Sequence, residues 1–144
     1  MYTKLALAIG INTIVMFFLT YALIDTADHF YANINRMYMA ILMAAPMVIV
    51  MLLVMRKMYP DARTNAVLHA AAAGVFLLVF WLARTQTPVG DVQFLRAMIP
   101  HHSSAILMCQ EASIEDAEIR TLCGEIVKAQ REEIAQMQRI LERF

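Results

Sequence analysis

Residues 37–55 read MYMAILMAAPMVIVMLLVM, an apolar stretch without a single charged side chain. Two similar stretches flank it: residues 5–24 carry no charge, and residues 66–83 contain His69 as their only ionisable group. A helix needs about 20 apolar residues to cross the hydrocarbon core of a bilayer. All three stretches meet this requirement. The sequence therefore predicts three transmembrane helices, at about 4–24, 37–56 and 66–84.

The composition supports this interpretation. Of the 144 residues, 60% are hydrophobic and 17% are charged, whereas a soluble domain is about 45–50% apolar and about 25% charged. Three buried core helices in a row are a poor alternative, because so short a chain has too little polar surface to cover them. The basic and acidic residues balance at 12 each, so nothing indicates nucleic acid as a partner.

The distribution of basic residues predicts the orientation, because cytoplasmic loops are enriched in Lys and Arg. The loop after the second stretch carries Arg56, Lys57 and Arg63. The loop after the first is mainly acidic, with Arg36 as its basic residue. We therefore expect a protein of the bacterial inner membrane with a cytoplasmic N-terminus. Everything from residue 87 onward then lies in the periplasm.

Residues 87–144 form the second predicted part, a helical hairpin following the transmembrane part at 1–86. Asp91 is a plausible helix N-cap, and residues 113–116 interrupt the helical periodicity. We expect an inward-facing stripe on each helix. On the first it holds Phe94, Met98, His101, Ala105, Met108 and Ala112, and on the second Ile119, Leu122, Ile126, Gln130, Glu133, Met137 and Ile140.

The expected stripe is not apolar throughout, and this makes it a candidate site. It holds His101, Gln130 and Glu133, with His102 at its edge and methionines nearby. Buried polar groups without partners cost several kcal/mol, so these groups bond each other, bind a ligand or face water. Imidazole and thioether are good copper ligands. The alternative is a hydrogen-bonded pair, His101 with Glu133, that only fixes the register of the hairpin.

Two segments of the hairpin resemble a known family. DVQFLRAMIPHHSSAILM (91–108) and IVKAQREEIAQM (126–137) look like the two motifs of the domain-of-unknown-function family DUF305, D-x-x-F-x-x-x-M-I-x-H-H-x-x-A-I-x-M and I-x-x-x-Q-x-x-E-I-x-x-M. The resemblance implies a helical, ferritin-like fold. It also implies copper, or another transition metal, because some members of the CopM type bind copper outside the cytoplasm. The implied metal ligands are Met98, His101, His102, Met108, Glu133 and Met137, with Gln130 and Asp91 orienting them.

Two helices cannot enclose the core of a four-helix bundle. We therefore expect a homo-oligomer, in which a second hairpin completes the bundle. Packing of the hairpin on the transmembrane part is the alternative.

Further candidate sites lie elsewhere in the chain. Cys109 and Cys123 face each other in the folded register, which permits a disulfide or a pair of soft metal ligands. Asp25, Asp28 and His29 form a possible secondary metal site, although a solvated loop is the simpler interpretation. Methionines repeat every four residues from Met39 to Met55. This repeat could form a pathway for Cu(I) across the membrane, or it could serve as adaptable packing.

These features together predict a function. We expect a membrane-anchored protein that captures or buffers copper outside the cytoplasm, with the lipid bilayer and a second copy as partners. A structural membrane protein whose polar stripe specifies helix pairing is the alternative. We expect no enzyme, because the sequence has neither a nucleophile–base arrangement nor a glycine-rich phosphate loop.

Overall fold

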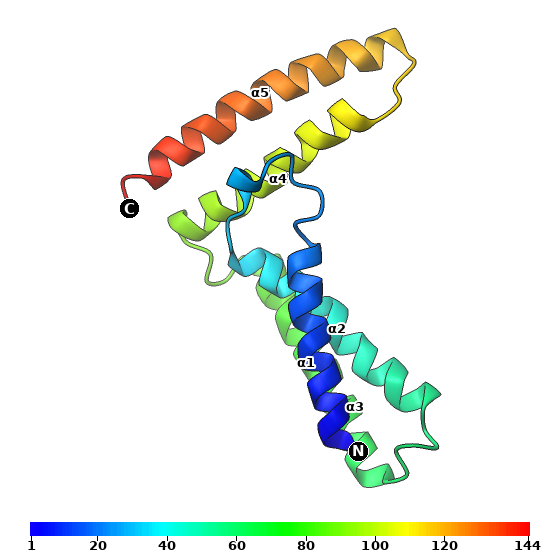
Figure 1. Ribbon diagram of the computed structural model, residues 1–144. Helices are drawn as coiled ribbons and strands as arrows, with labels where there is room; N and C mark the ends of the chain where they lie inside the picture. The colour runs from blue at the N-terminus through cyan, green and yellow to red at the C-terminus, as the bar shows by residue number, and fades with distance from the viewer. The chain divides into compact units, whose positions relative to one another are not determined.

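A computed structural model describes the whole chain, residues 1–144, and it is all-helical, as predicted (Figure 1). The α-helices, in chain order, are α1 Tyr2–Leu19, α2 Ile34–Val54, α3 Ala62–Thr85, α4 Asp91–Glu111 and α5 Ala117–Leu141. A short 3-10 helix, η1, occupies Ala27–His29. The predicted helix at 4–24 ends earlier than expected, because residues after Thr20 leave the helix for an ordered loop.

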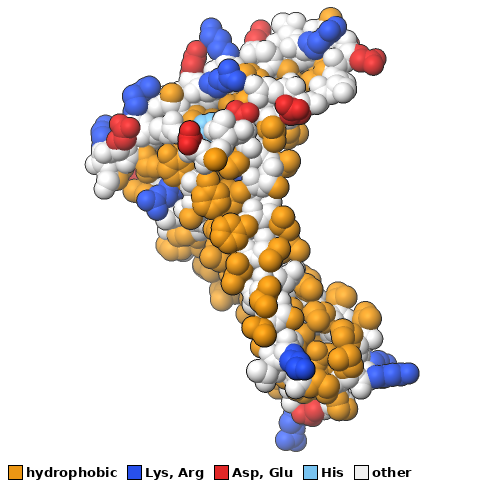
Figure 2. All heavy atoms as spheres, viewed as in Figure 1, with side chains coloured by type: hydrophobic (Ala, Val, Ile, Leu, Met, Phe, Trp, Pro, Cys, Tyr) orange, Lys and Arg blue, Asp and Glu red, His pale blue; other side chains and the backbone are white.

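Helices α1, α2 and α3 are 18, 21 and 24 residues long and are apolar enough to cross a membrane. Large apolar side chains are exposed along all three, including Leu7, Leu53 and Leu77. Figure 2 shows hydrophobic side chains over the surface of these helices, whereas charged side chains are spread over α4 and α5. Exposed apolar surface of this extent needs a non-aqueous environment, which indicates a membrane protein.

The chain divides into two compact units. We call Met1–Thr20 with Asn35–Pro88 the membrane unit, and Tyr21–Ile34 with Val89–Phe144 the hairpin unit. Residues 21–34, which we call the strap, thus group by contact with the hairpin, whereas the sequence-based division listed them with residues 1–86. The reason is physical, because the strap's polar groups bond to α4 instead of remaining solvated.

The membrane unit has a small core at Leu5, Leu52 and Tyr59. Beside it, the Tyr2 hydroxyl donates to Oδ1 of Asn65 at 2.9 Å, and Nδ2 of Asn65 donates to the Tyr59 carbonyl at 2.7 Å. These bonds tie α1 and α3 to the loop after α2. Asp61 caps α3, since its carboxylate accepts from the Arg63 backbone N–H.

The methionine repeat of α2 does not line a single enclosed path. Met39 and Met43 are exposed, whereas Met51 and Met55 pack against the core at Leu5 and Leu52. The methionine row is therefore exposed at one end of α2 and packed at the other, which suits a role as adaptable packing. His69, on α3, contacts the Asn65 carbonyl through Nδ1 at 2.7 Å.

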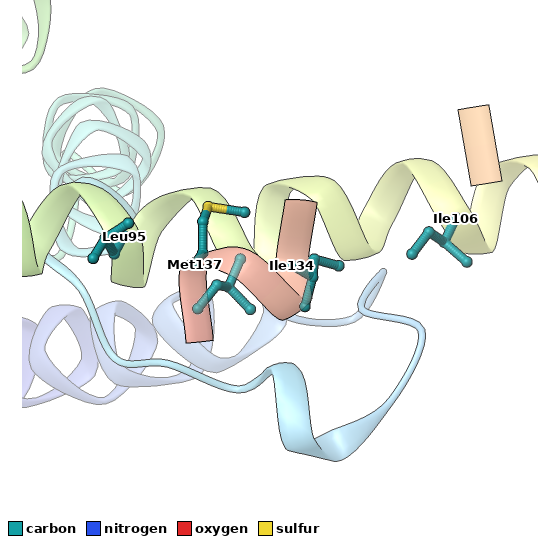
Figure 3. Close-up of a cluster of buried hydrophobic side chains, with 5 residues drawn as sticks. Leu95, Ile106, Ile134 and Met137 are labelled. Atoms are coloured by element: carbon teal, nitrogen blue, oxygen red, sulfur yellow. The ribbon is translucent and has the colours of Figure 1, made fainter. Parts of the chain in front are cut away.

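The hairpin unit is built from α4 and α5, joined by a short connection at residues 112–116 (Figure 1). Asp116 caps α5, accepting from the backbone N–H groups of Glu118 and Ile119. The buried cluster of the unit comprises Leu95, Ile99, Ile106, Ile134 and Met137. In Figure 3, Ile134 and Met137 of α5 lie over α4 beside Leu95, with Ile106 farther along α4.

The buried face of α4 is rotated by one residue from the predicted stripe. Leu95, Ile99 and Ile106 are buried, whereas the expected inward residues Phe94 and Met108 are 52% and 62% exposed. Both sets have helical spacing, but the observed set is the more apolar and takes the core. On α5, Ile119 and Leu122 are also exposed, and Ile134 joins Met137 inside.

The strap covers a second face of α4. Ser103 is 0% exposed. Its hydroxyl accepts from the Asp25 backbone N–H at 2.7 Å and lies 2.9 Å from Nδ1 of His29. Farther along the strap, Asn33 donates to the Arg96 carbonyl at 3.2 Å. The strap thus covers part of the hairpin surface that a second hairpin was expected to cover.

Candidate functional site

His102 and Glu133 form the polar contact that crosses the hairpin. Nε2 of His102 lies 2.8 Å from Oε2 of Glu133, and Nδ1 lies 2.9 Å from the Met98 carbonyl. The His102 side chain is 13% exposed, and the Glu133 side chain is 54% exposed. One imidazole therefore connects a carboxylate of α5 to the backbone of α4 at the edge of the core.

Both partners of His102 are acceptors, because a carbonyl oxygen and an ionised carboxylate carry no proton to donate. The two contacts are therefore both hydrogen bonds only when both ring nitrogens carry a proton. In that state the imidazolium is bonded at both ends, and the contact with Glu133 is a charge-assisted hydrogen bond. A metal ion that binds a nitrogen of this imidazolium replaces the proton there.

His101 does not occupy the position that the sequence predicted. We expected it on the buried stripe facing Gln130 and Glu133, with His102 at the edge, but His101 is exposed and His102 takes the inner place. This is the same one-residue rotation of α4 that buries Leu95 and Ile99. The two imidazole rings remain neighbours, with centroids 6.0 Å apart.

The other predicted ligands are divided between the core and the surface. Met98 is partly buried against the core cluster, and Met137 belongs to it. Met108 is exposed and faces away from that cluster. Gln130 is half-buried, and Asp91 is the exposed first residue of α4, with Gly90 as the N-cap in its place.

Met98, His101 and His102 lie at spacings of three and four along α4, so their side chains share one side of the helix. With Glu133 opposite His102, this side presents one thioether, two imidazoles and one carboxylate. No group of three or more His, Cys, Asp and Glu side chains in the chain is close enough to hold a metal ion.

Asp25, Asp28 and His29 are not brought together as a metal site. The Asp25 backbone and the His29 ring both bond to Ser103, and Asp28 is exposed. In the amide orientation of Gln110 that satisfies its neighbours, its nitrogen donates to Oδ1 of Asp25 and its oxygen accepts from Arg131, both at 2.9 Å. These residues hold the strap on the hairpin.

Sequence reasoning missed the polar residues of α4 that receive the strap. Ser103 bonds to the strap at Asp25 and His29, and Gln93 accepts from the Ile34 backbone N–H at 3.0 Å. A usable signal was present. The loop holds three aromatic residues, Tyr21, Phe30 and Tyr31, which is unusual for a solvated connection.

Cys109 and Cys123 form a disulfide between α4 and α5, with Cα atoms 5.3 Å apart. The folded register predicted this proximity and left the oxidation state open. The bridge lies near the connection between the helices. It closes the end of the hairpin opposite Leu95 and Met137.

The comparisons with known proteins agree with the two sequence motifs. The family described as "Domain of unknown function (DUF305)" matches residues 79–141. A protein of Acanthamoeba polyphaga mimivirus, named "Uncharacterized protein L153", is 30% identical over 112 residues, covering 76% of this chain and 72% of that protein. This chain belongs to the DUF305 family. No solved structure matches it.

The DUF305 segment contains the whole of α4 and α5, and with them the His102–Glu133 pair and the disulfide. The match to the viral protein is longer than the stretch from residue 79 to the C-terminus. It therefore includes part of the chain that precedes the DUF305 segment. The likeness is not confined to the hairpin.

Proposed function

We propose that this DUF305 protein is a membrane-anchored metal-binding protein that captures or buffers copper outside the cytoplasm. The observation that carries the proposal is the side of α4 where Met98, His101 and His102 lie together, with Glu133 contacting His102 at 2.8 Å. Thioether and imidazole are the neutral ligands that suit Cu(I). A carboxylate on the far nitrogen of an imidazole orients that ligand and raises its basicity.

The donor set fits copper by its chemistry. His101 is exposed and its ring has no hydrogen bond that would have to be broken before a metal binds. Nδ1 of His102, which faces the Met98 carbonyl, would bind the metal in place of a proton. Nε2 would keep Glu133 as its partner. Met98, which is partly buried against the core, would supply a thioether sulfur, and Met137 lies within the core itself. The copper ion is the cargo, and these side chains bind it.

Several features support the proposed location. The helices α1, α2 and α3 would anchor the hairpin unit to the bilayer. The basic residues of the loop after α2 favour the cytoplasmic side for that loop. A disulfide such as Cys109–Cys123 persists in oxidising compartments, which favours a hairpin outside the cytoplasm.

The proposal includes a second copy of the chain. Phe94, Met108 and Leu122 are large apolar side chains exposed on the hairpin unit, and a two-helix hairpin cannot cover them by itself. A second hairpin would bury them in a four-helix bundle. Chemical cross-linking of the detergent-solubilised protein tests this, and Phe94→Ser with Leu122→Ser is expected to abolish the cross-linked species.

One observation favours a second candidate function. Both ring nitrogens of His102 lie within hydrogen-bonding distance of an acceptor of this chain, Glu133 and the Met98 carbonyl, so the pair can serve as a purely structural contact. In this alternative the His102–Glu133 contact fixes the register of α4 against α5, as single buried polar positions do in coiled coils. The protein would then be a structural or pairing module.

Anaerobic titration with Cu(I) against a chelator of micromolar affinity separates the two functions. Metal binding predicts competition by the wild-type protein and its loss in His101→Ala with His102→Ala. Glu132→Ala, at an exposed neighbour of Glu133, is the matched control and should bind normally. If the wild-type protein does not compete for Cu(I), the result would favour the structural function, in which the His102–Glu133 contact fixes the helix register.

A further inference from the structure

The disulfide of the hairpin unit borders a cavity. Cys109 and Cys123 are half-buried, and a cavity of about 350 Å³ adjoins both. Its walls are mostly small or apolar, from Ala112, Ile114, Gly124 and Val127, and Arg120 is the one charged residue that lines it. A thiol reductant or a metal ion therefore has space beside the sulfur atoms.

Arg120 gives this cavity a fixed cation. Its Nη2 donates to the Glu115 carbonyl at 3.0 Å, which holds the guanidinium at the mouth of the connection between α4 and α5. A cation near a cysteine stabilises the thiolate, and the thiolate is both the leaving group in disulfide exchange and the metal ligand. Cavity and cation together distinguish this bridge from one sealed in a core.

We infer that the Cys109–Cys123 bridge is a redox switch whose reduced form binds a soft monovalent metal ion between the two sulfurs. A low-molecular-weight thiol attacks one cysteine sulfur as its thiolate, forming a mixed disulfide and releasing the other cysteine. A second thiol then attacks the mixed disulfide. Two electrons pass to the protein, both cysteines become thiols, and the two reductant molecules leave as their own disulfide. Binding of Cu(I) then displaces the two thiol protons.

The fold keeps the two thiols together after the bridge opens. The core of the hairpin, at Ile99, Ile134 and Met137, lies beyond the disulfide, and Asp116 caps α5 independently of it. The Cα separation of 5.3 Å is therefore expected to persist. Two thiolates held across a hairpin form a preorganised pair for Cu(I), which thiolate ligands select.

This dithiol site is separate from the proposed imidazole and thioether site. Cys109 lies seven residues after His102, about 10 Å along α4 at 1.5 Å per residue. Its donors are sulfur alone. The inference goes beyond the proposed function and can hold when that function fails.

The test uses the full-length protein in detergent, oxidised or reduced with a thiol and then freed of the reductant anaerobically. Each form is titrated with Cu(I) against a chelator. The reduced protein is expected to bind one further equivalent, with sulfur-only coordination of that ion by X-ray absorption. Cys109→Ser with Cys123→Ser should show no difference between the two treatments. His101→Ala with His102→Ala should keep the further equivalent, which separates this site from the proposed function.

Three results would overturn the inference. They are equal binding by the oxidised and reduced proteins, resistance of the bridge to thiols in the folded protein, and loss of helical circular dichroism on reduction. Alkylation of the reduced wild-type protein is a second way to remove the thiols. It should abolish the further equivalent even where the serine variant does not fold. Arg120→Gln is expected to slow the reduction several-fold, and an unchanged rate would remove Arg120 from the mechanism.

Discussion

Nε2 of His102 lies 2.8 Å from Oε2 of Glu133, and this contact joins the two helices of the hairpin unit beside its core. The partners come from the two sequence motifs that identify the family, one on α4 and one on α5. The contact therefore forms only when the two helices are paired. Its energetic contribution can be measured separately from any metal.

Removal of Glu133 should weaken the hairpin slightly. We expect Glu133→Ala to lower the free energy of unfolding by about 0.5–1 kcal/mol, because a half-exposed pair is screened by solvent. A double-mutant cycle with His102→Ala, followed by thermal unfolding, isolates the coupling. Glu132→Ala is the control and should change little. A coupling of zero would show that the contact does not stabilise the hairpin.

Removal of the Ser103 hydroxyl should release the strap. In Ser103→Ala the Asp25 backbone N–H and the His29 ring lose their partner, and an unsatisfied buried group costs about 1–3 kcal/mol. Hydrogen exchange at the Asp25 amide should become faster. Ser104→Ala is the matched control, since that hydroxyl bonds only to the Pro100 carbonyl of its own helix. Equal exchange in both variants would contradict the role of Ser103.

The observed buried face of α4 predicts which substitutions in the hairpin destabilise the fold. Ile99 is fully buried, so Ile99→Ala should lower the free energy of unfolding by about 2–5 kcal/mol through lost burial and a residual cavity. Leu122→Ala, at a 53% exposed position of α5, should have a far smaller effect on the monomer. Thermal unfolding monitored by circular dichroism checks both. A larger loss of stability in Leu122→Ala than in Ile99→Ala would instead support the buried stripe that was predicted from the sequence.

The stabilisation of α3 by its N-cap, Asp61, should depend on pH. The hydroxyl of Thr64 donates to the Asp61 carboxylate, and the Arg63 backbone N–H does so at 3.1 Å, which together hold the pKa of Asp61 below its usual value. The contribution of the cap is therefore complete above the unfolded pKa, about 3.9, and is lost as the pH falls through the lower folded pKa. NMR titration of Asp61 measures it. Thr64→Val should raise the pKa, and an unchanged value would contradict the assignment.

The transmembrane helices and the hairpin could be predicted from the sequence, since long apolar runs and helical periodicity are local properties. The proximity of Cys109 and Cys123 followed from the folded register alone. These predictions needed no knowledge of distant contacts.

The identity of the inward histidine could not be predicted in the same way. Residues 94, 98 and 101 and residues 95, 99 and 102 have the same spacing, and only packing against Ile134 and Met137 decides between them. The strap was missed for a related reason. Its bonds to Ser103 and Gln93 join residues about 60 to 80 positions apart, which no local pattern records.

X-ray absorption of the copper-loaded, oxidised protein tests the proposed metal site most directly, because the disulfide then excludes thiolate ligands. We expect imidazole nitrogen and thioether sulfur around Cu(I), with the imidazole contribution lost in His101→Ala with His102→Ala. A spectrum without imidazole, or one unchanged in that variant, would contradict it.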